Sequence, residues 1–154
     1  MKIGVDIDDT ICRGRGKETP EALSEEWSES IVNATPIDGA REAIRSLIND
    51  GHRIYFISSR YVQDRGITER WIHLNLGLRG NEFNLCLRLP DLYGPSFKRT
   101  MISSLGIDVY IDDMPRLIVI ASDHGAHGIL FTNWKNVMEE IERLKNDMRI
   151  LSLV

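Results

Sequence analysis

The chain has 154 residues, of which 42% are hydrophobic and 27% are charged, and its formal net charge at pH 7 is -4. This composition is typical of a globular domain with its own core, and it excludes a largely disordered chain. The negative charge argues against a protein that holds nucleic acid through its overall field, while it leaves room for a local basic rim. Every apolar run is far shorter than the roughly 18 residues of a membrane span, and Met1 leads directly into a strand pattern rather than a signal peptide. We therefore expect a cytoplasmic protein whose two cysteines, Cys12 and Cys86, remain thiols.

The first predicted strand ends in a group of acidic residues. An apolar pattern over residues 3–7 runs into Asp6, Asp8, Asp9 and Thr10. Because side chains two apart on a strand share a face, we expect Asp6 and Asp8 to be neighbours. Carboxylates at the end of a buried strand are costly to desolvate unless a cation or hydrogen-bond donors satisfy them, and Asp oxygens suit a hard ion such as Mg²⁺. The alternative is that Asp8, Asp9 and Thr10 only form an Asx-type turn.

Strand and helix patterns alternate along the rest of the chain, which is typical of a parallel sheet covered by helices. A short amphipathic helix is expected at about 20–32, before this alternation resumes. The patterns then predict helices over 38–50, 67–76, 97–105, 117–122 and 134–148, and strands over 54–57, 84–89, 109–111 and 128–131.

Polar residues follow the predicted strands at the point where each strand ends. Ser58 follows the second strand, and Asp112 and Asp113 follow the fourth. Ligands of open α/β sheets bind at the carboxyl ends of the strands. We therefore interpret these residues, together with Asp6 and Asp8, as one site. For Asp113 a helix N-cap ahead of a proline remains the alternative.

The residues resemble, in order and spacing, the four signature motifs of the haloacid dehalogenase-like (HAD) phosphatases. These are the Asp6 to Thr10 segment, Ser58, Lys98 and the Asp112-Asp113 pair. The resemblance implies an α/β fold: a three-layer, Rossmann-like parallel sheet of about five strands in the order 5-4-1-2-3, with helices on both faces. It also implies a single domain over residues 1–154, with a small helical cap insertion at about 12–36.

The resemblance further implies a Mg²⁺-dependent phosphomonoester hydrolase that acts through an aspartyl-phosphate. Asp6 would be the nucleophile, and Asp8 would protonate the leaving oxygen and then activate water. The cation would be held by Asp6, the main-chain carbonyl of Asp8 and Asp113. Asp112 would support the ligands or replace one of them.

The same resemblance implies that Ser58 and Lys98 bind the phosphate. They would contact phosphoryl oxygens that gain charge during the reaction. A shift of one residue in the helix register would bring Arg99 inward in place of Lys98. Thr10, Ser59 and Arg60 are the expected substrate-binding residues, with Arg60 the strongest candidate for a direct contact.

The substrate is the least determined part of the prediction. Residues 57–60, Thr68 and Trp71 are similar to the 5'(3')-deoxyribonucleotidase branch, although the predicted cap is smaller. Arg60, Thr68, Arg70 and Trp71 also resemble phage-type polynucleotide kinase/phosphatases. We therefore expect a nucleotide as the small phosphorylated substrate, with a nucleic-acid 3'-phosphate end or a sugar phosphate as alternatives, and a silent phosphate-binding module as the non-enzymatic one. A membrane partner is not expected, and a homo-oligomer is left open.

Two further features bear on the substrate. Trp27, in the expected cap helix, is the tryptophan that we consider for base stacking. A basic rim is expected from Arg13, Arg15, Lys17, Arg60 and Arg65, which would steer phosphorylated substrates.

Overall fold

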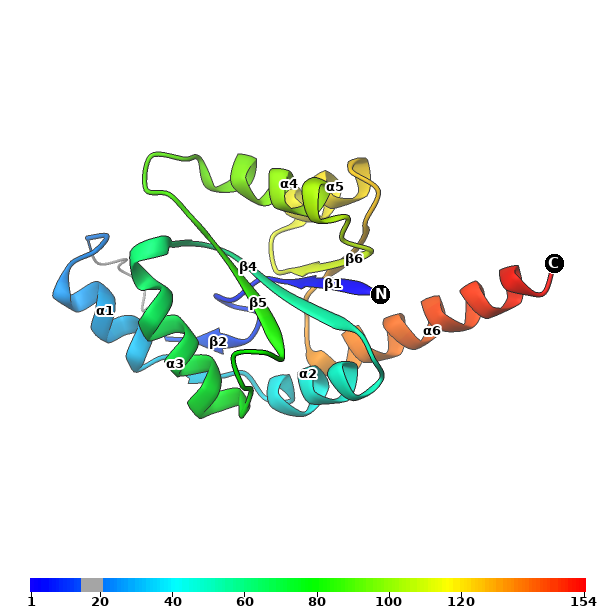
Figure 1. Ribbon diagram of the computed structural model, residues 1–154, viewed down its shortest axis with the longest axis horizontal. Coiled ribbons are helices and arrows are strands. Elements are labelled where there is room, and N and C mark those ends of the chain that lie inside the picture. The colour runs from blue at the N-terminus through cyan, green and yellow to red at the C-terminus, as the bar shows by residue number, and fades with distance from the viewer. Residues whose placement is uncertain (15–20) are drawn as a thin grey trace.

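The computed structural model describes residues 1–14 and 21–154, and Arg15 and Lys17 of the expected basic rim lie outside the described residues. A sheet of five parallel strands runs through the middle of the molecule (Figure 1). Its strands are β1 (Lys2–Val5), β4 (Arg53–Tyr61), β5 (Phe83–Arg88), β6 (Val109–Asp112) and β7 (His127–Leu130).

The strands lie side by side in the order β5-β4-β1-β6-β7. Counted along the chain within this sheet and read from β7, this is the arrangement 5-4-1-2-3 that the sequence predicts. The labels differ because two strands that were not predicted, β2 (Cys12–Arg13) and β3 (Thr35–Pro36), take numbers between β1 and β4. They form a separate antiparallel ribbon, and strands of two residues are too short to show a period in the sequence.

Helices cover both faces of the sheet (Figure 1). A large apolar core lies under the α2, α3 and α6 face, and a smaller one lies under the α4 and α5 face. Alternate residues of β4 serve the two cores, since Phe56 belongs to the first and Ile57 to the second. The predicted α/β architecture with a helix-covered parallel sheet is confirmed. The helices are α2 (Ala40–Asn49), α3 (Arg65–Leu76), α4 (Gly94–Leu105), α5 (Pro115–Asp123) and α6 (Trp134–Ser152).

In its described residues, 12–14 and 21–36, the segment expected to form a cap contains the β2-β3 ribbon and one short helix, α1 (Glu25–Val32). The helix begins after Ser24, whose Oγ accepts a hydrogen bond from Trp27 N at 3.2 Å and so satisfies one of the free N–H groups of the first turn. α1 packs beside α3 (Figure 1). The described helix therefore starts later than the predicted 20–32.

Several element boundaries differ from the predictions for local reasons. β1 ends at Val5, so the chain leaves the sheet before Asp6. β4 continues to Tyr61 because its polar last residues still pair with β5, where the register shifts between Ser58 and Tyr61. α4 already begins at Gly94, with proline in its first turn, where the missing N–H costs no hydrogen bond. None of the described helices combines the length and the apolar character that crossing a membrane requires.

Candidate active site

The ends of β1 and β6 bring three carboxylates together. Asp6 follows β1 directly, and its N–H donates to Ile111 O of the neighbouring β6 at 2.9 Å. Asp112 is the last residue of β6 and Asp113 the next. Carboxylate oxygens of Asp6, Asp112 and Asp113 all lie within 4.8 Å of one another. Residues far apart in the sequence therefore form one acidic cluster at the carboxyl edge of the sheet.

Lys98 reaches this cluster from α4. Its Nζ lies 2.7 Å from Asp6 Oδ1 and 2.9 Å from Asp112 Oδ2, and its side chain is buried. The neighbouring Arg99 is exposed. Of the two basic residues considered for this position, it is Lys98 that faces the carboxylates.

The charges of the cluster do not balance. Burial raises the pKa of Asp6 to about 8, against the opposing effect of Lys98, and the nearby Asp112 raises it further. Burial and then Asp112 also raise the pKa of Asp113. Burial lowers the pKa of Lys98, but Asp6 and Asp112 raise it by more, so the ammonium stays charged. The Lys98 ammonium thus contacts two of the three acidic groups, and their hard oxygen ligands fit a divalent cation such as Mg²⁺.

The carboxylate of Asp112 is held on both of its oxygens. Oδ2 accepts hydrogen bonds from Lys98 Nζ and from the Tyr110 hydroxyl at 2.7 Å, and Oδ1 accepts one from Met114 N at 3.0 Å. Tyr110 is fully buried, and nothing in the sequence separated it from the other apolar residues of its strand. The donors around Asp112 suit a supporting role, which leaves Asp113 as the better candidate ligand of the pair.

Asp8 lies in a turn rather than in the strand. β1 has already ended, Asp9 has a φ of 62°, and Asp9 N donates to Cys12 O at 2.8 Å. The Asp8 carboxylate binds Arg60 through two bonds, Nε to Oδ2 at 3.1 Å and Nη2 to Oδ1 at 2.8 Å. Asp6 and Asp8 therefore pair with different basic residues. The prediction that the two share a strand face is wrong, because β1 ends at Val5, before both of them.

The remaining predicted residues surround these groups. Ser58 is buried, and its Oγ accepts a hydrogen bond from Arg60 N at 3.1 Å. Ser59 is half-buried and lies against the start of α4, where a Cβ at Gly94 would come within 2.8 Å of its Oγ. Thr10 is buried, its carbonyl accepts a hydrogen bond from Trp134 Nε1 at 3.0 Å, and its Oγ1 has no hydrogen-bond partner among the described residues.

The short helix α1 is attached to the body through Trp27. The indole is only 6% exposed, and its Nε1 donates to Asp64 Oδ2 at 2.8 Å. Asp64 closes the short helix η1 (Val62–Asp64), and the ring of Trp27 packs at a tilt against Tyr61, with 5.9 Å between ring centroids. Trp27 thus serves as a packing residue here, in contrast to the exposed ring that base stacking needs.

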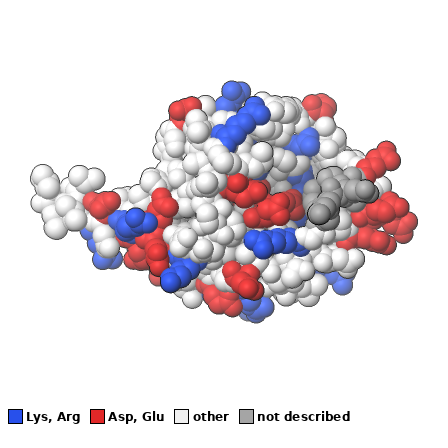
Figure 2. Space-filling view, turned by 180° about the vertical axis from the view of Figure 1, so that it is seen from behind, with Lys and Arg blue, Asp and Glu red and all other residues white. Residues whose placement is uncertain are grey.

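The surface at the α1 end is acidic (Figure 2). Glu25, Glu26 and Glu29 of this helix are exposed. Arg13 and Arg65 of the expected basic rim are also exposed, so the described rim carries both signs of charge. Arg60 was wrongly expected at this rim, because its side chain is buried against Asp8.

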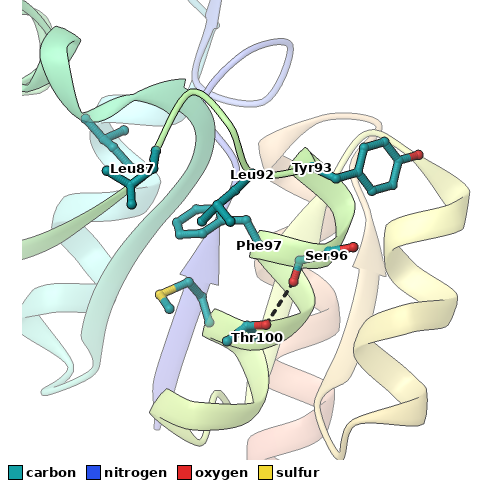
Figure 3. A pocket seen from close by; sticks show the side chains of 8 residues that line it. Leu87, Leu92, Tyr93, Ser96, Phe97 and Thr100 are labelled. Atoms are coloured by element: carbon teal, nitrogen blue, oxygen red, sulfur yellow. Dashed lines mark hydrogen bonds between the residues drawn. The ribbon is translucent and has the colours of Figure 1, made fainter.

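An apolar pocket of about 310 Å³ lies between the end of β5 and α4 (Figure 3). Leu87, Leu92 and Phe97 converge on it, while Ser96 and Thr100 line the helix side. Positions 96, 97 and 100 form one side of α4, and Lys98 lies on another side of the same helix. The carboxylate cluster and this pocket therefore use different faces of α4.

The sequence matches no model of a known protein family and no curated protein. Solved structures do share its fold. A HAD-superfamily hydrolase from Ehrlichia chaffeensis aligns with a TM-score of 0.60 and 14% identity, covering 93% of this chain and 96% of the other. A class C acid phosphatase from Bacillus anthracis aligns with a TM-score of 0.58 and 17% identity, covering 86% of this chain and 66% of the other.

A third similar structure is that of the Pnkp1/Rnl/Hen1 RNA repair complex, with a TM-score of 0.67 and 15% identity. The alignment covers 84% of this chain, which spans only 42% of the matched chain of that complex. Together these structures show that the chain has the fold of HAD-superfamily hydrolases.

Proposed function

We propose that the protein is a Mg²⁺-dependent phosphomonoester hydrolase that forms an aspartyl-phosphate on Asp6. The observation that supports this most directly is the cluster in which Lys98 contacts Asp6 and Asp112 while oxygens of Asp6, Asp112 and Asp113 lie within 4.8 Å of one another. Such an excess of buried carboxylate is costly without a cation, and a phosphate monoester can approach carboxylates only when positive charge offsets its own. The fold shared with an acid phosphatase agrees with this reaction.

The residues can divide the reaction between them. An oxygen of Asp6 attacks phosphorus, the bond from phosphorus to the leaving oxygen breaks, and Asp8, which enters this step in its protonated form, donates its proton to that oxygen. Asp8 then takes a proton from water, which attacks the aspartyl-phosphate, releases phosphate and restores Asp6. A cation held by Asp6, the Asp8 carbonyl and Asp113 would draw charge from a phosphoryl oxygen.

Two donors are placed to bind the phosphoryl group. Lys98 supplies a fixed positive charge beside the nucleophile. The Ser58 hydroxyl already accepts a hydrogen bond from Arg60 N, so its own proton is available for a phosphoryl oxygen. Donors fixed before the reaction contribute most where charge develops.

For the substrate we propose a small phosphate monoester, with a nucleotide as first choice, in a cytoplasmic enzyme. The exposed acidic residues of α1 oppose a long polyanion more than a small one. The likeness to a chain of an RNA repair complex favours a nucleic-acid 3'-phosphate end as the second candidate. A homo-oligomer stays a prediction.

The activity is tested with a generic aryl phosphate, assayed with Mg²⁺ and with EDTA. We expect turnover that EDTA abolishes and that Asp6→Asn lowers by ~10³-fold or more, because the nucleophile is lost. Asp123→Asn, an exposed position on α5, is the matched control and should retain full activity. Absence of wild-type turnover, or turnover indifferent to Asp6→Asn, contradicts the proposal and favours a silent phosphate-binding module.

The substrate class is tested with a panel of 5'- and 3'-deoxynucleotides, sugar phosphates and a 3'-phosphorylated oligonucleotide. We expect the highest kcat/KM on a mononucleotide. Preference for the oligonucleotide would replace the first candidate by the second, and preference for a sugar phosphate would reject both.

A further inference from the structure

We propose that Arg60 is a positioning residue, which orients Asp8 from behind and makes no contact with the substrate. The proposal rests on the proposed function, because it concerns the proton transfers assigned to Asp8. It also replaces the role of Arg60 expected from the sequence, which was a direct substrate contact.

The geometry of the pair is that of a two-pronged bond. Nε and Nη2 of Arg60 donate to separate oxygens of Asp8, at 3.1 Å and 2.8 Å. A planar guanidinium that binds both oxygens fixes the plane of the carboxylate as well as its position. Asp8 is thereby held in one orientation.

Exposure shows on which side the substrate can approach. The side chain of Arg60 is 0% exposed, whereas that of Asp8 is 29% exposed. A phosphate ester that enters from solvent meets Asp8 first, and the guanidinium lies behind it. Each nitrogen of the guanidinium also donates to a neighbour already, to Asp8, Thr68 or Cys12, so Arg60 acts on the substrate only through Asp8.

Arg60 is itself anchored by neighbours on two elements. Its Nη1 donates to Thr68 Oγ1 of α3 at 3.2 Å, and its backbone N–H donates to Ser58 Oγ of β4 at 3.1 Å. Cys12 Sγ lies 3.4 Å from Nη2. A buried arginine with this set of partners is fixed before substrate binds, so it can hold the Asp8 carboxyl group in one orientation while that group gives up and then regains its proton.

The consequence depends on the leaving group. A poor leaving group such as an alkoxide needs the proton from Asp8, whereas 2,4-dinitrophenolate departs without one. If Asp8 loses its orientation, the hydrolysis of an alkyl phosphate should therefore slow far more than the hydrolysis of 2,4-dinitrophenyl phosphate. Loss of a substrate contact would slow both equally, because the phosphoryl group is the same.

The test measures kcat/KM, which reports the steps up to departure of the leaving group, for both substrates. We expect Arg60→Lys, which keeps the charge but loses the fork, to lower kcat/KM by ~10²-fold on the alkyl phosphate and by only a few-fold on the dinitrophenyl ester. Thr68→Val removes the hydrogen bond from Arg60 Nη1 to Thr68 Oγ1. It should also lower kcat/KM more on the alkyl phosphate than on the dinitrophenyl ester, by smaller factors. Arg70→Lys, an exposed arginine of α3, is the matched control.

A second arm places Arg60→Lys in an Asp8→Asn background. If Arg60 acts through Asp8, the second substitution adds no further loss, since residues that act as one unit are not additive. Equal losses on both substrates, or full additivity with Asp8→Asn, would overturn the inference. Should Arg60→Lys fail to fold, Thr68→Val carries the same comparison.

The two proposals fail in different ways. A wild-type protein that hydrolyses neither ester refutes the proposed function. If the wild type hydrolyses both esters and the variants lose the same factor in kcat/KM on each of them, only the role of Arg60 is refuted.

Discussion

Asp112 and Asp113 are adjacent in the sequence but differ in their surroundings. Asp112 is fully buried and accepts hydrogen bonds from Lys98, Tyr110 and the backbone of Met114. Asp113 is half-buried and has an oxygen within the acidic cluster. Asp112 thus holds Lys98 in place, and Asp113 is the one of the two that we propose as a ligand of the cation.

This difference predicts separate effects for two substitutions. Asp113→Asn should raise the Mg²⁺ concentration needed for half-maximal rise in melting temperature, because a ligand charge is lost, and should leave the cation-free protein about as stable as before. Asp112→Asn should destabilise the cation-free protein by about 1–3 kcal/mol, since buried donors lose their charged acceptor.

Both variants are measured by thermal unfolding across a Mg²⁺ titration, beginning in EDTA. Tyr110→Phe serves as a milder companion to Asp112→Asn, as it removes one of the donors and keeps the ring. Equal Mg²⁺ midpoints for wild type and Asp113→Asn would contradict the assignment of Asp113 as a ligand.

At the scale of elements, α5 packs against β7 at a glycine. A Cβ on Gly128 would lie 2.6 Å from Ile118 Cγ2 and 2.9 Å from Ile118 O, closer than atoms can approach. The backbone oxygen belongs to a helix and cannot turn aside as a side chain would. The close packing of α5 on β7 therefore depends on glycine at this position.

Gly128→Ala should lower the free energy of unfolding by about 1–3 kcal/mol, which is the usual cost of overpacking. Gly66 in α3 is the matched control, because a Cβ there has no heavy atom within 4 Å. Gly66→Ala should stabilise the protein by about 0.5–1 kcal/mol, since alanine is the better helix former. Urea unfolding of both variants checks this, and a Gly128→Ala protein as stable as the wild type would show that α5 can move away from β7.

The strands and helices differ in how well the sequence predicted them. The strand and helix periods of residues that face the two cores were strong enough to predict the elements of the sheet and its helices. The two-residue strands β2 and β3 show no period, and the polar end of β4 resembled a loop. Local boundaries depend on pairing with a neighbour, which the sequence of one segment does not contain.

In the candidate site, the sequence predicted which residues come together but not where the longer side chains point. Asp6 and Asp112 were predicted because the ends of parallel strands meet at one edge, and Lys98 because the sequence resembles the HAD motifs; the structure brings the three together. The direction of a long side chain was beyond the sequence: Arg60 turns inward to Asp8, and the Tyr110 hydroxyl turns toward Asp112. Both are set by the space that packing leaves, rather than by spacing along the chain.

At the scale of the whole molecule, the acidic cluster joins β1, β6 and α4, which come from distant parts of the chain. These elements are adjacent only in the folded state, so the cost of gathering the carboxylates is a cost of folding. The pKa of Asp6 rises from 3.8 to about 8, first through burial. Folding should therefore be coupled to proton uptake at this site.

The sign of the effect follows from this shift in pKa. Between pH 3.8 and about 8 the folded chain retains a proton on Asp6 that the unfolded chain has lost. The stability linked to that proton is complete below the lower value and is lost as the pH rises through the upper one. In EDTA, the free energy of unfolding of the wild type should thus fall between about pH 5 and about pH 8.5.

Asp6→Asn removes this titration, so its stability in EDTA should change less with pH than that of the wild type. Mg²⁺ should stabilise the wild type more at the higher pH, where the carboxylate is ionised and binds a cation best. Urea unfolding at the two pH values, with EDTA or Mg²⁺, measures both effects. If the free energy of unfolding in EDTA changed equally with pH in the wild type and in Asp6→Asn, Asp6 would be ionised in the folded protein at both pH values. The positive charge of Lys98 would then be enough to stabilise the cluster without Mg²⁺.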